Sequence, residues 1–163
     1  MREIISVGIG EYYVAKSPLV LRTILGSCVG VLLYDKAHKI GGLAHVYLPS
    51  SEDYKNTRDK SINSHKYADI LIPHMINDMI KNGANKRYFI SYILGGASLF
   101  NIKPDSNLNI GKKNLLMVKK ILKETKITFF ELKVGGNTGI KVFFDLTNGD
   151  INVKDLSKNG NNR

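Results

Sequence analysis

Cysteine is almost absent from this sequence, since Cys28 is the only one among 163 residues. A single thiol excludes an internal disulfide framework, and it also excludes a zinc site built from several cysteines. The His, Asp and Glu residues do not show metal-ligand spacing either, so we expect no metal and no cofactor. Two interpretations of Cys28 are left: a small buried core residue, which is usual for a free cysteine, or a reactive thiol.

Long apolar runs are also missing. The apolar stretch at 29–34 is far shorter than the roughly 20 residues that a membrane-spanning helix needs. The first ten residues lack the length and the cleavage pattern of a signal peptide. We therefore expect a cytoplasmic protein without membrane insertion.

Acidic residues are scarce, with 14 Asp and Glu against 24 Lys and Arg and a net charge of +10. Such an excess raises the question of nucleic-acid binding. However, the basic residues are mostly scattered lysines, and no arginine-rich arm, RNP-like aromatic motif or zinc spacing accompanies them. We expect no nucleic-acid partner. The densest group, six lysines within 112–126, indicates a solvated helix face or, as the alternative, a docking surface for an acidic protein or an anionic membrane.

The first part of the chain reads mainly as strands and the rest as a mixture. Runs of β-branched and aromatic residues between turn signals predict strands at 4–9, 11–16, 19–25, 29–34, 40–48, 87–94, 127–134, 140–146 and 150–154. A spacing of apolar residues close to 3.6 predicts helices over 66–82 and 112–123. Pro73 requires the first helix to begin near Asp69, and Gly83 is expected to end it. Residues 50–64 are predicted to form a loop.

These elements predict an α+β fold, in which mainly antiparallel β-sheets carry two principal α-helices within a single domain. We expect residues 1–157 to form this domain. The polar, Gly- and Asn-rich residues 158–163 are expected to form a flexible tail.

Cys28 lies where a strand meets a tight turn, in the sequence TILGSCVG of residues 23–30. Gly26 allows backbone conformations that other residues avoid. A turn of this kind can leave backbone N–H groups unpaired, as an oxyanion hole requires. We therefore name Gly26 and Ser27 as candidate oxyanion residues. A β-bulge around a buried cysteine is the alternative interpretation.

His45 is a polar ring within an apolar strand, where it needs a partner. If the strands at 29–34 and 40–48 form a hairpin about residues 35–39, residues whose numbers add up to about 73–74 lie opposite one another. This register pairs Cys28 directly with His45, as a nucleophile and its base would be paired. A core histidine with an ordinary partner is the alternative.

A base also needs a group that fixes its tautomer, and Thr23 on the preceding strand could serve through its hydroxyl. A threonine is equally an ordinary strand former. The segment Gly95-Gly96-Ala97-Ser98 does not match a phosphate-binding motif. We expect it to form a tight turn beside the active site, where Gly95, Gly96 and Ser98 contact the substrate.

Several blocks in a fixed order resemble the CheD family of chemoreceptor glutamine deamidases. They are residues 7–12, the cysteine block 23–29, the histidine block 42–49, residues 66–69 with 82–84, residues 94–100, residues 109–111 with Asn114, and residues 135–139. The cysteine and histidine blocks carry the most specific part of this resemblance. Lys133 and Ile140, which flank the last block, depart from the family pattern. The resemblance therefore does not extend to the contacts that this loop makes with substrate or partner.

The resemblance implies hydrolysis of selected glutamine side chains in the cytoplasmic region of chemoreceptors, giving glutamate and ammonia. Cys28 would attack the carboxamide, His45 would move the proton, water would resolve the thioester, and Thr23 matches the third catalytic position. The resemblance also implies a CheC-type phosphatase as a partner. The alternative is a non-catalytic adaptor that regulates by binding chemoreceptors or such a phosphatase.

Overall fold

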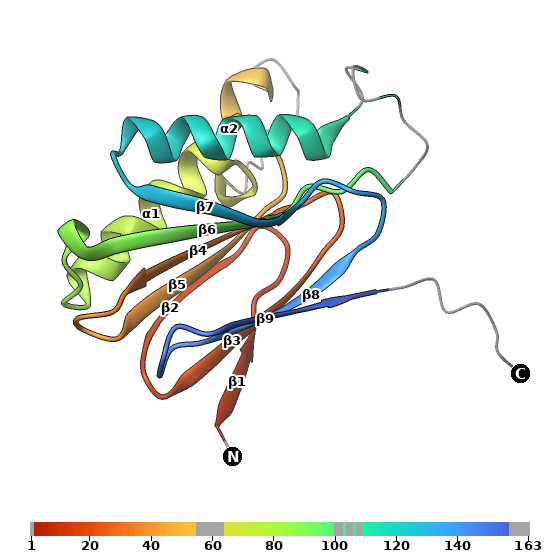
Figure 1. The fold of residues 1–163 in the computed structure, drawn as a ribbon. Helices are drawn as coiled ribbons and strands as arrows, with labels where there is room; N and C mark the ends of the chain where they lie inside the picture. Colours follow the sequence, from red (N-terminus) through yellow and green to blue (C-terminus); the bar gives the residue numbers. More distant parts are fainter. Residues whose placement is uncertain (1, 55–63, 100–102, 104–105, 107–108, 157–163) are drawn as a thin grey trace, which may run out of the picture.

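The computed structural model describes residues 2–54, 64–99, 103, 106 and 109–156. Within them, nine strands form two sheets (Figure 1). The first sheet has the order β1-β3-β8-β9 and the second the order β2-β5-β4-β6-β7. The strands are β1 Glu3–Ser6, β2 Tyr12–Lys16, β3 Leu19–Leu25, β4 Val29–Asp35, β5 Ile40–Val46, β6 Phe89–Gly95, β7 Thr128–Val134, β8 Ile140–Asp145 and β9 Ile151–Asp155.

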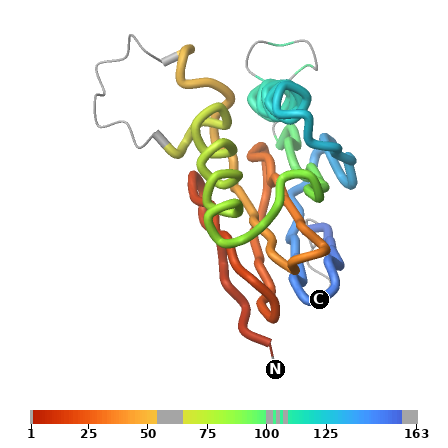
Figure 2. The backbone as a smooth tube through the Cα atoms, turned by 90° about the vertical axis from the view of Figure 1, so that its left-hand side faces the viewer, coloured from red at the N-terminus to blue at the C-terminus, as the bar shows by residue number. Residues whose placement is uncertain are grey.

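Two helices, α1 (Ala68–Lys81) and α2 (Ile110–Glu124), cover one face of the five-stranded sheet, and the four-stranded sheet packs on its other face. Figure 2 shows α2 end-on, beside the upper end of α1. One core, which includes Val31 and Met75, lies under the helices, and a second, which includes Leu32 and Phe144, lies between the sheets. Among the strands of the described residues, only β1–β3 and β6–β7 are parallel pairs. The predicted α+β fold with mainly antiparallel sheets and two principal helices is therefore confirmed.

Helix α1 begins at Ala68, one residue before the predicted start near Asp69, and Pro73 lies in its second turn. The start is fixed from outside the helix, because the N–H of Ala68 donates to Leu48 O at 3.0 Å. Asp69 then accepts hydrogen bonds from the backbone N–H and the hydroxyl of Ser51. At the other end Gly83, with φ +101°, follows the helix as predicted.

The hairpin of β4 and β5 is confirmed, but its predicted register is wrong. Val29 pairs with Val46 and Gly30 with His45, so opposite residues add up to 75. Cys28 therefore precedes β4 and does not lie directly opposite His45. The turn contains Lys39 with φ 53°, a conformation unusual for a residue with a side chain. The spacing of apolar residues does not reveal this conformation. Strand β4 also runs one residue further than predicted, to the polar Asp35, which pairs with Ile40.

The predicted loop at 50–64 contains two short 3₁₀ helices, Ser51–Tyr54 and Ser64–Lys66. Residues 55–63 lie outside the described part of the chain, as do residues 157–163. The tail expected at 158–163 and the domain boundary at 157 therefore stay predictions.

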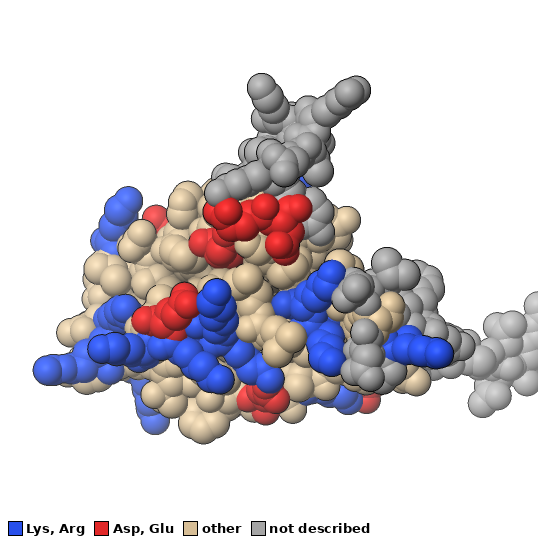
Figure 3. All heavy atoms as spheres, turned by 90° about the horizontal axis from the view of Figure 1, so that it is seen from above, with Lys and Arg blue, Asp and Glu red and all other residues tan. Residues whose placement is uncertain are grey.

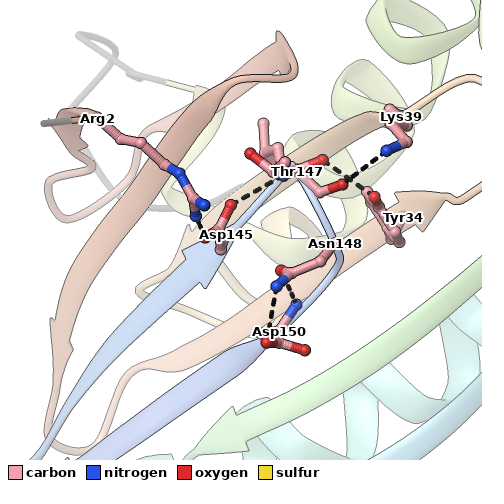
Figure 4. A network of polar contacts seen from close by, with 8 residues as sticks. Arg2, Tyr34, Lys39, Asp145, Thr147, Asn148 and Asp150 are labelled. Atoms are coloured by element: carbon pink, nitrogen blue, oxygen red, sulfur yellow. Dashed lines mark hydrogen bonds and ion pairs between the residues drawn. The ribbon is translucent and has the colours of Figure 1, made fainter.

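The two sheets are joined at the end of the strands remote from Cys28 (Figure 4). From the β4–β5 hairpin, Tyr34 Oη donates to Leu146 O at 3.0 Å, and Lys39 Nζ donates to Thr147 O at 3.1 Å. Asp145 pairs with Arg2 and accepts from the Thr147 N–H. This network connects the β4–β5 turn of one sheet to the β8–β9 turn of the other.

Figure 3 looks down on the helical layer, where basic side chains lie among acidic ones. The lysines of α2 are mostly exposed, and Lys119 forms an ion pair with Glu131 on β7 at 2.5 Å. Among the described residues no helix is long and apolar enough to span a bilayer.

Candidate active site

His45 brings the two sheets into contact at the end of β5. Its imidazole Nδ1 lies 2.8 Å from Thr23 Oγ1, and Thr23 belongs to β3 of the other sheet. Both side chains are buried, with 3% of their surface exposed. The strand spacing accounts for this meeting, because Leu43 and His45 lie on the same face of β5 and Leu43 is part of the core between the sheets.

The hydrogen bonds of Thr23 determine which imidazole nitrogen carries the proton. The hydroxyl has one hydrogen, and it donates to Val7 O at 2.8 Å. The contact with His45 therefore requires that Nδ1–H donates to the hydroxyl oxygen. The lone pair of the neutral ring is then on Nε2. This nitrogen is buried and has no hydrogen-bond partner among the described residues, so it is available as a proton acceptor.

Cys28 reaches the same region from the neighbouring strand. It lies one residue before β4 and two residues from Gly30, which pairs with His45. Alternate residues of a strand share a face, so Cys28 and His45 are diagonal neighbours on the inner face of the sheet. Gly30, directly opposite the histidine, carries no side chain, and Leu25 of β3 packs over it, because a Cβ on Gly30 would lie 2.8 Å from Leu25 Cδ1. Cys28 is 7% exposed and belongs to the core between the sheets.

Burial keeps both groups uncharged. It raises the pKa of the Cys28 thiol to about 11. Burial also lowers the pKa of His45, and the Val7 carbonyl and the charge of Glu11 offset part of this decrease. At neutral pH the site therefore holds a thiol and a neutral imidazole. No hydrogen bond joins them within the described residues, and catalytic hydrogen bonds are often loose before substrate binds.

The glycine-containing segment 95–98, at the end of β6, lies beside Cys28. Its expected contact with substrate stays a prediction. The N–H of Gly96 donates to Cys28 O at 2.8 Å. A Cβ on Gly95 would lie 2.5 Å from that same carbonyl oxygen, so only glycine allows this approach. The Ser98 N–H donates to Gly136 O at 2.9 Å. The N–H groups of Gly96 and Ser98 are thus occupied in fixing the loops around the thiol.

The loop before Cys28 contains the N–H groups that are still available. Gly26 O accepts from the Ala97 N–H at 2.9 Å, which fixes the start of this loop. In the part of the chain that the structure describes, the backbone N–H groups of Ser27 and Cys28 donate to no acceptor. These two N–H groups belong to the loop that carries the thiol, and unpaired backbone N–H groups are what a developing oxyanion needs.

Sequence reasoning brought together Cys28, His45 and Thr23, and the structure places all three in one region. It missed the carbonyl of Val7, which sets the direction of the Thr23 hydrogen bond. No sequence signal could have revealed a backbone acceptor after β1. Among the described residues no group of three or more His, Cys, Asp or Glu side chains could hold a metal ion.

Comparison with known proteins places this arrangement in a family. Residues 47–155 match the family model CheD, described as CheD chemotactic sensory transduction. The chain belongs to the CheD family. A protein of Clostridium kluyveri is 43% identical over 152 residues, covering 92% of this chain and 91% of its own. Proteins of Caldanaerobacter subterraneus subsp. tengcongensis and Moorella thermoacetica are 40% and 38% identical, each covering 94% of this chain and 94% and 92% of their own.

These three CheD relatives share one name, "Probable chemoreceptor glutamine deamidase CheD". The matched segment begins two residues after His45, so Thr23, Cys28 and His45 precede it. The alignments with the CheD relatives cover more than nine-tenths of the chain. The membership that the cysteine and histidine blocks suggested is therefore confirmed.

Proposed function

We propose that this chain is a chemoreceptor glutamine deamidase, which hydrolyses glutamine side chains of a chemoreceptor to glutamate and ammonia. The observation that carries the proposal is the Thr23–His45 hydrogen bond of 2.8 Å, which leaves Nε2 free on the face that Cys28 shares. A thiol, a base with a defined tautomer and two free N–H groups are the groups that amide hydrolysis through a thioester requires. The name shared by the CheD relatives supports the same substrate.

In the proposed first step the glutamine carboxamide enters beside Cys28. His45 Nε2 takes the thiol proton as the sulfur attacks the carboxamide carbon, and the carboxamide oxygen becomes an oxyanion held by the N–H groups of Ser27 and Cys28. The imidazolium then gives its proton to the departing nitrogen, and ammonia leaves a thioester on Cys28. Water, deprotonated by the same Nε2, attacks this thioester, and glutamate and the free thiol are released.

Thr23 contributes by keeping His45 in one tautomer and one orientation throughout both steps. Its hydroxyl is itself fixed by Val7 O at 2.8 Å. When the ring becomes protonated, the charge is buried, and the Thr23 oxygen and the nearby Glu11 charge stabilise it. This assignment leaves Nε2 as the nitrogen that exchanges protons with Cys28 and with the substrate.

We also propose the partners and location that follow from this activity. The substrate is the cytoplasmic region of a chemoreceptor, so the chain acts in the cytoplasm. A CheC-type phosphatase remains a proposed second partner. The glycine loops at 95–98 and 135–136 are joined by the Ser98–Gly136 hydrogen bond, and the first of them contacts Cys28 O through the Gly96 N–H. Both loops would face whichever partner covers the site.

A second candidate function is a non-catalytic adaptor that binds a chemoreceptor or a phosphatase. One observation favours it: the thiol is 7% exposed, its pKa is raised to about 11, and it has no hydrogen bond to His45 among the described residues. An adaptor would not need a reactive thiol. The two candidates differ in turnover by the wild-type protein: a deamidase releases ammonia and loses this activity in Cys28→Ala, whereas an adaptor releases none. Binding of the receptor survives Cys28→Ala in both cases.

The test is a coupled assay of ammonia release from a chemoreceptor cytoplasmic fragment, with wild type, Cys28→Ala and His45→Ala. His38→Ala serves as the control, since His38 is a half-exposed histidine in the hairpin turn, bonded to Asp35. We expect release with wild type and His38→Ala alone. Turnover by Cys28→Ala would contradict the thioester route. Binding of the fragment without release by wild type would favour the adaptor.

A further inference from the structure

Asn114 of α2 is a polar side chain in an otherwise apolar contact. It is fully buried, and so are Val118 and Leu122, one and two turns further along the same helix. Packing alone would be served by an apolar residue of similar size. The amide instead brings a disadvantage, because its Oδ1 is buried and has no hydrogen-bond partner among the described residues, and an unpaired buried acceptor is destabilising.

The NH₂ group of Asn114 explains why an amide occupies this position. Asn114 Nδ2 donates to Tyr47 O at 3.1 Å and to Ser27 O at 3.3 Å. Ser27 is the residue before Cys28, and Tyr47 is two residues beyond His45. One NH₂ group therefore joins the loop of the proposed nucleophile to the residue that follows the strand of the proposed base.

Helix α2 is itself fixed against the same region, so Asn114 has a rigid support. The Asn109 side chain caps its first turn by accepting from the Lys112 N–H at 3.1 Å. A Cβ on Gly111 would lie 2.4 Å from Gly96 O. The helix backbone thus contacts the glycine segment whose Gly96 N–H bonds to Cys28 O. Asn114 lies one turn further, where its amide spans the two catalytic segments.

We infer that Asn114 is a positioning residue for the deamidation reaction, which holds the Cys28 loop and the His45 strand in the separation that proton transfer requires. This inference rests on the proposed function. The amide does not contact the reacting atoms. It acts through the carbonyls of Ser27 and Tyr47, and so determines where the thiol and the free N–H groups of the loop lie relative to Nε2.

The decisive variant is Asn114→Leu, which preserves the side-chain volume and removes both the donor and the unpaired acceptor. We expect kcat on the receptor fragment to fall by about tenfold to a hundredfold, the usual effect of a small misplacement of reacting groups. KM should change little, because Asn114 is buried. The melting temperature should fall, because the carbonyls of Ser27 and Tyr47 lose their donor and removal of the unpaired oxygen offsets only part of this loss. Activity is therefore measured at a temperature where circular dichroism shows the variant folded.

Two further variants exclude a merely structural role. Val118→Ala leaves a cavity on the same helix and lowers stability, but it holds neither catalytic segment, so its kcat should match wild type. Asn114→Asp keeps the shape and replaces the donor by a second oxygen, and its kcat should fall at least as far as that of Asn114→Leu. If kcat of Asn114→Leu stays within about twofold of Val118→Ala, an effect too small for misplaced reacting groups, the inference is wrong.

Alkylation of Cys28 by iodoacetamide, followed by intact mass, separates this inference from the proposed function. Once the loop is released, the buried thiol should react several-fold faster in Asn114→Leu than in wild type or Val118→Ala. This result would support the positioning role even if wild type released no ammonia, which would count against the proposed function alone. Equal alkylation rates in Asn114→Leu and Val118→Ala would overturn the positioning role.

Discussion

Replacing Thr23 by valine tests the assignment of the base most sharply. The change keeps the shape of a buried β-branched side chain and removes the hydroxyl that accepts from His45 Nδ1–H and donates to Val7 O, each at 2.8 Å. It leaves two buried polar groups without partners. An unsatisfied buried group costs about 1–3 kcal/mol, so we expect the free energy of unfolding to fall by about 2 kcal/mol or more.

The effect on catalysis follows from the tautomer. Without the hydroxyl, Nδ1–H has lost its acceptor, and the ring can rotate or carry its proton on Nε2, where it no longer accepts from the thiol. If orientation of the ring is worth about 1.5–3 kcal/mol in the transition state, kcat falls roughly 10- to 150-fold. Thr23→Ser retains the hydroxyl and should keep most of the activity.

The assay is ammonia release from the receptor fragment at a temperature where circular dichroism shows each variant folded. Thr125→Val is the matched control. Its hydroxyl donates to Ile121 O at 2.8 Å at the end of α2, away from the proposed site. A Thr23→Val variant as active as Thr125→Val would refute the role of Thr23. Equal losses in Thr23→Ser and Thr23→Val would show that the hydroxyl is not the group that matters.

Three further predictions concern charge, reactivity and packing. Burial alone would raise the pKa of Asp35, but hydrogen bonds from Asn85 N and His38 lower it overall. The ionised Asp35 therefore stabilises the fold above about pH 4, and this stabilisation is lost as pH falls through the lowered pKa. In urea unfolding, wild type should be more stable than Asp35→Asn above pH 4, and the difference should be much smaller below it. Burial raises the pKa of Cys28 to about 11. The rate of its alkylation should therefore rise about tenfold per pH unit up to pH 10, because the thiolate fraction rises by that factor below the pKa. Gly111→Ala should lower stability by about 1–3 kcal/mol or more, measured by thermal unfolding, because its Cβ would lie 2.4 Å from Gly96 O.

Each of these predictions has a contradicting outcome. A gap between wild type and Asp35→Asn that is the same at pH 3 and pH 7 would mean that the carboxylate is not stabilised by its partners. An alkylation rate that levels off near pH 8 would mean that the thiol is not desolvated. Gly135→Ala is the control for Gly111→Ala, because a Cβ at Gly135 contacts nothing within 4 Å and only the φ of +72° opposes it. Equal stability of Gly111→Ala and wild type would contradict the tight packing of α2.

The sequence predicted the fold class and the order of elements well, because apolar spacing reports which face of an element is buried. The hairpin of β4 and β5 follows from two apolar runs around a polar turn. The register of this hairpin could not be predicted, because the left-handed conformation of Lys39 does not change the apolar pattern. The start of α1 was predicted to within one residue, but the contact that fixes it could not be, because Ala68 N–H donates to the distant Leu48 carbonyl and no local side chain caps the helix.

The candidate site was predictable as far as it depends on residue type. A lone cysteine after a glycine turn and a histidine in an apolar strand are local signals. The meeting of Thr23 with His45 depends on two sheets packing face to face, which no local pattern shows. One sequence feature could have identified Asn114 as a candidate: it is an amide on the apolar face of α2, in line with Val118 and Leu122.

The central claim is that Cys28 attacks the glutamine carboxamide. The most direct measurement is the intact mass of a chemoreceptor cytoplasmic fragment after incubation with wild type or with Cys28→Ala. We predict a gain of about one dalton per converted glutamine with wild type, as NH₂ is replaced by OH, and no gain with Cys28→Ala. An equal gain with both proteins would contradict the claim.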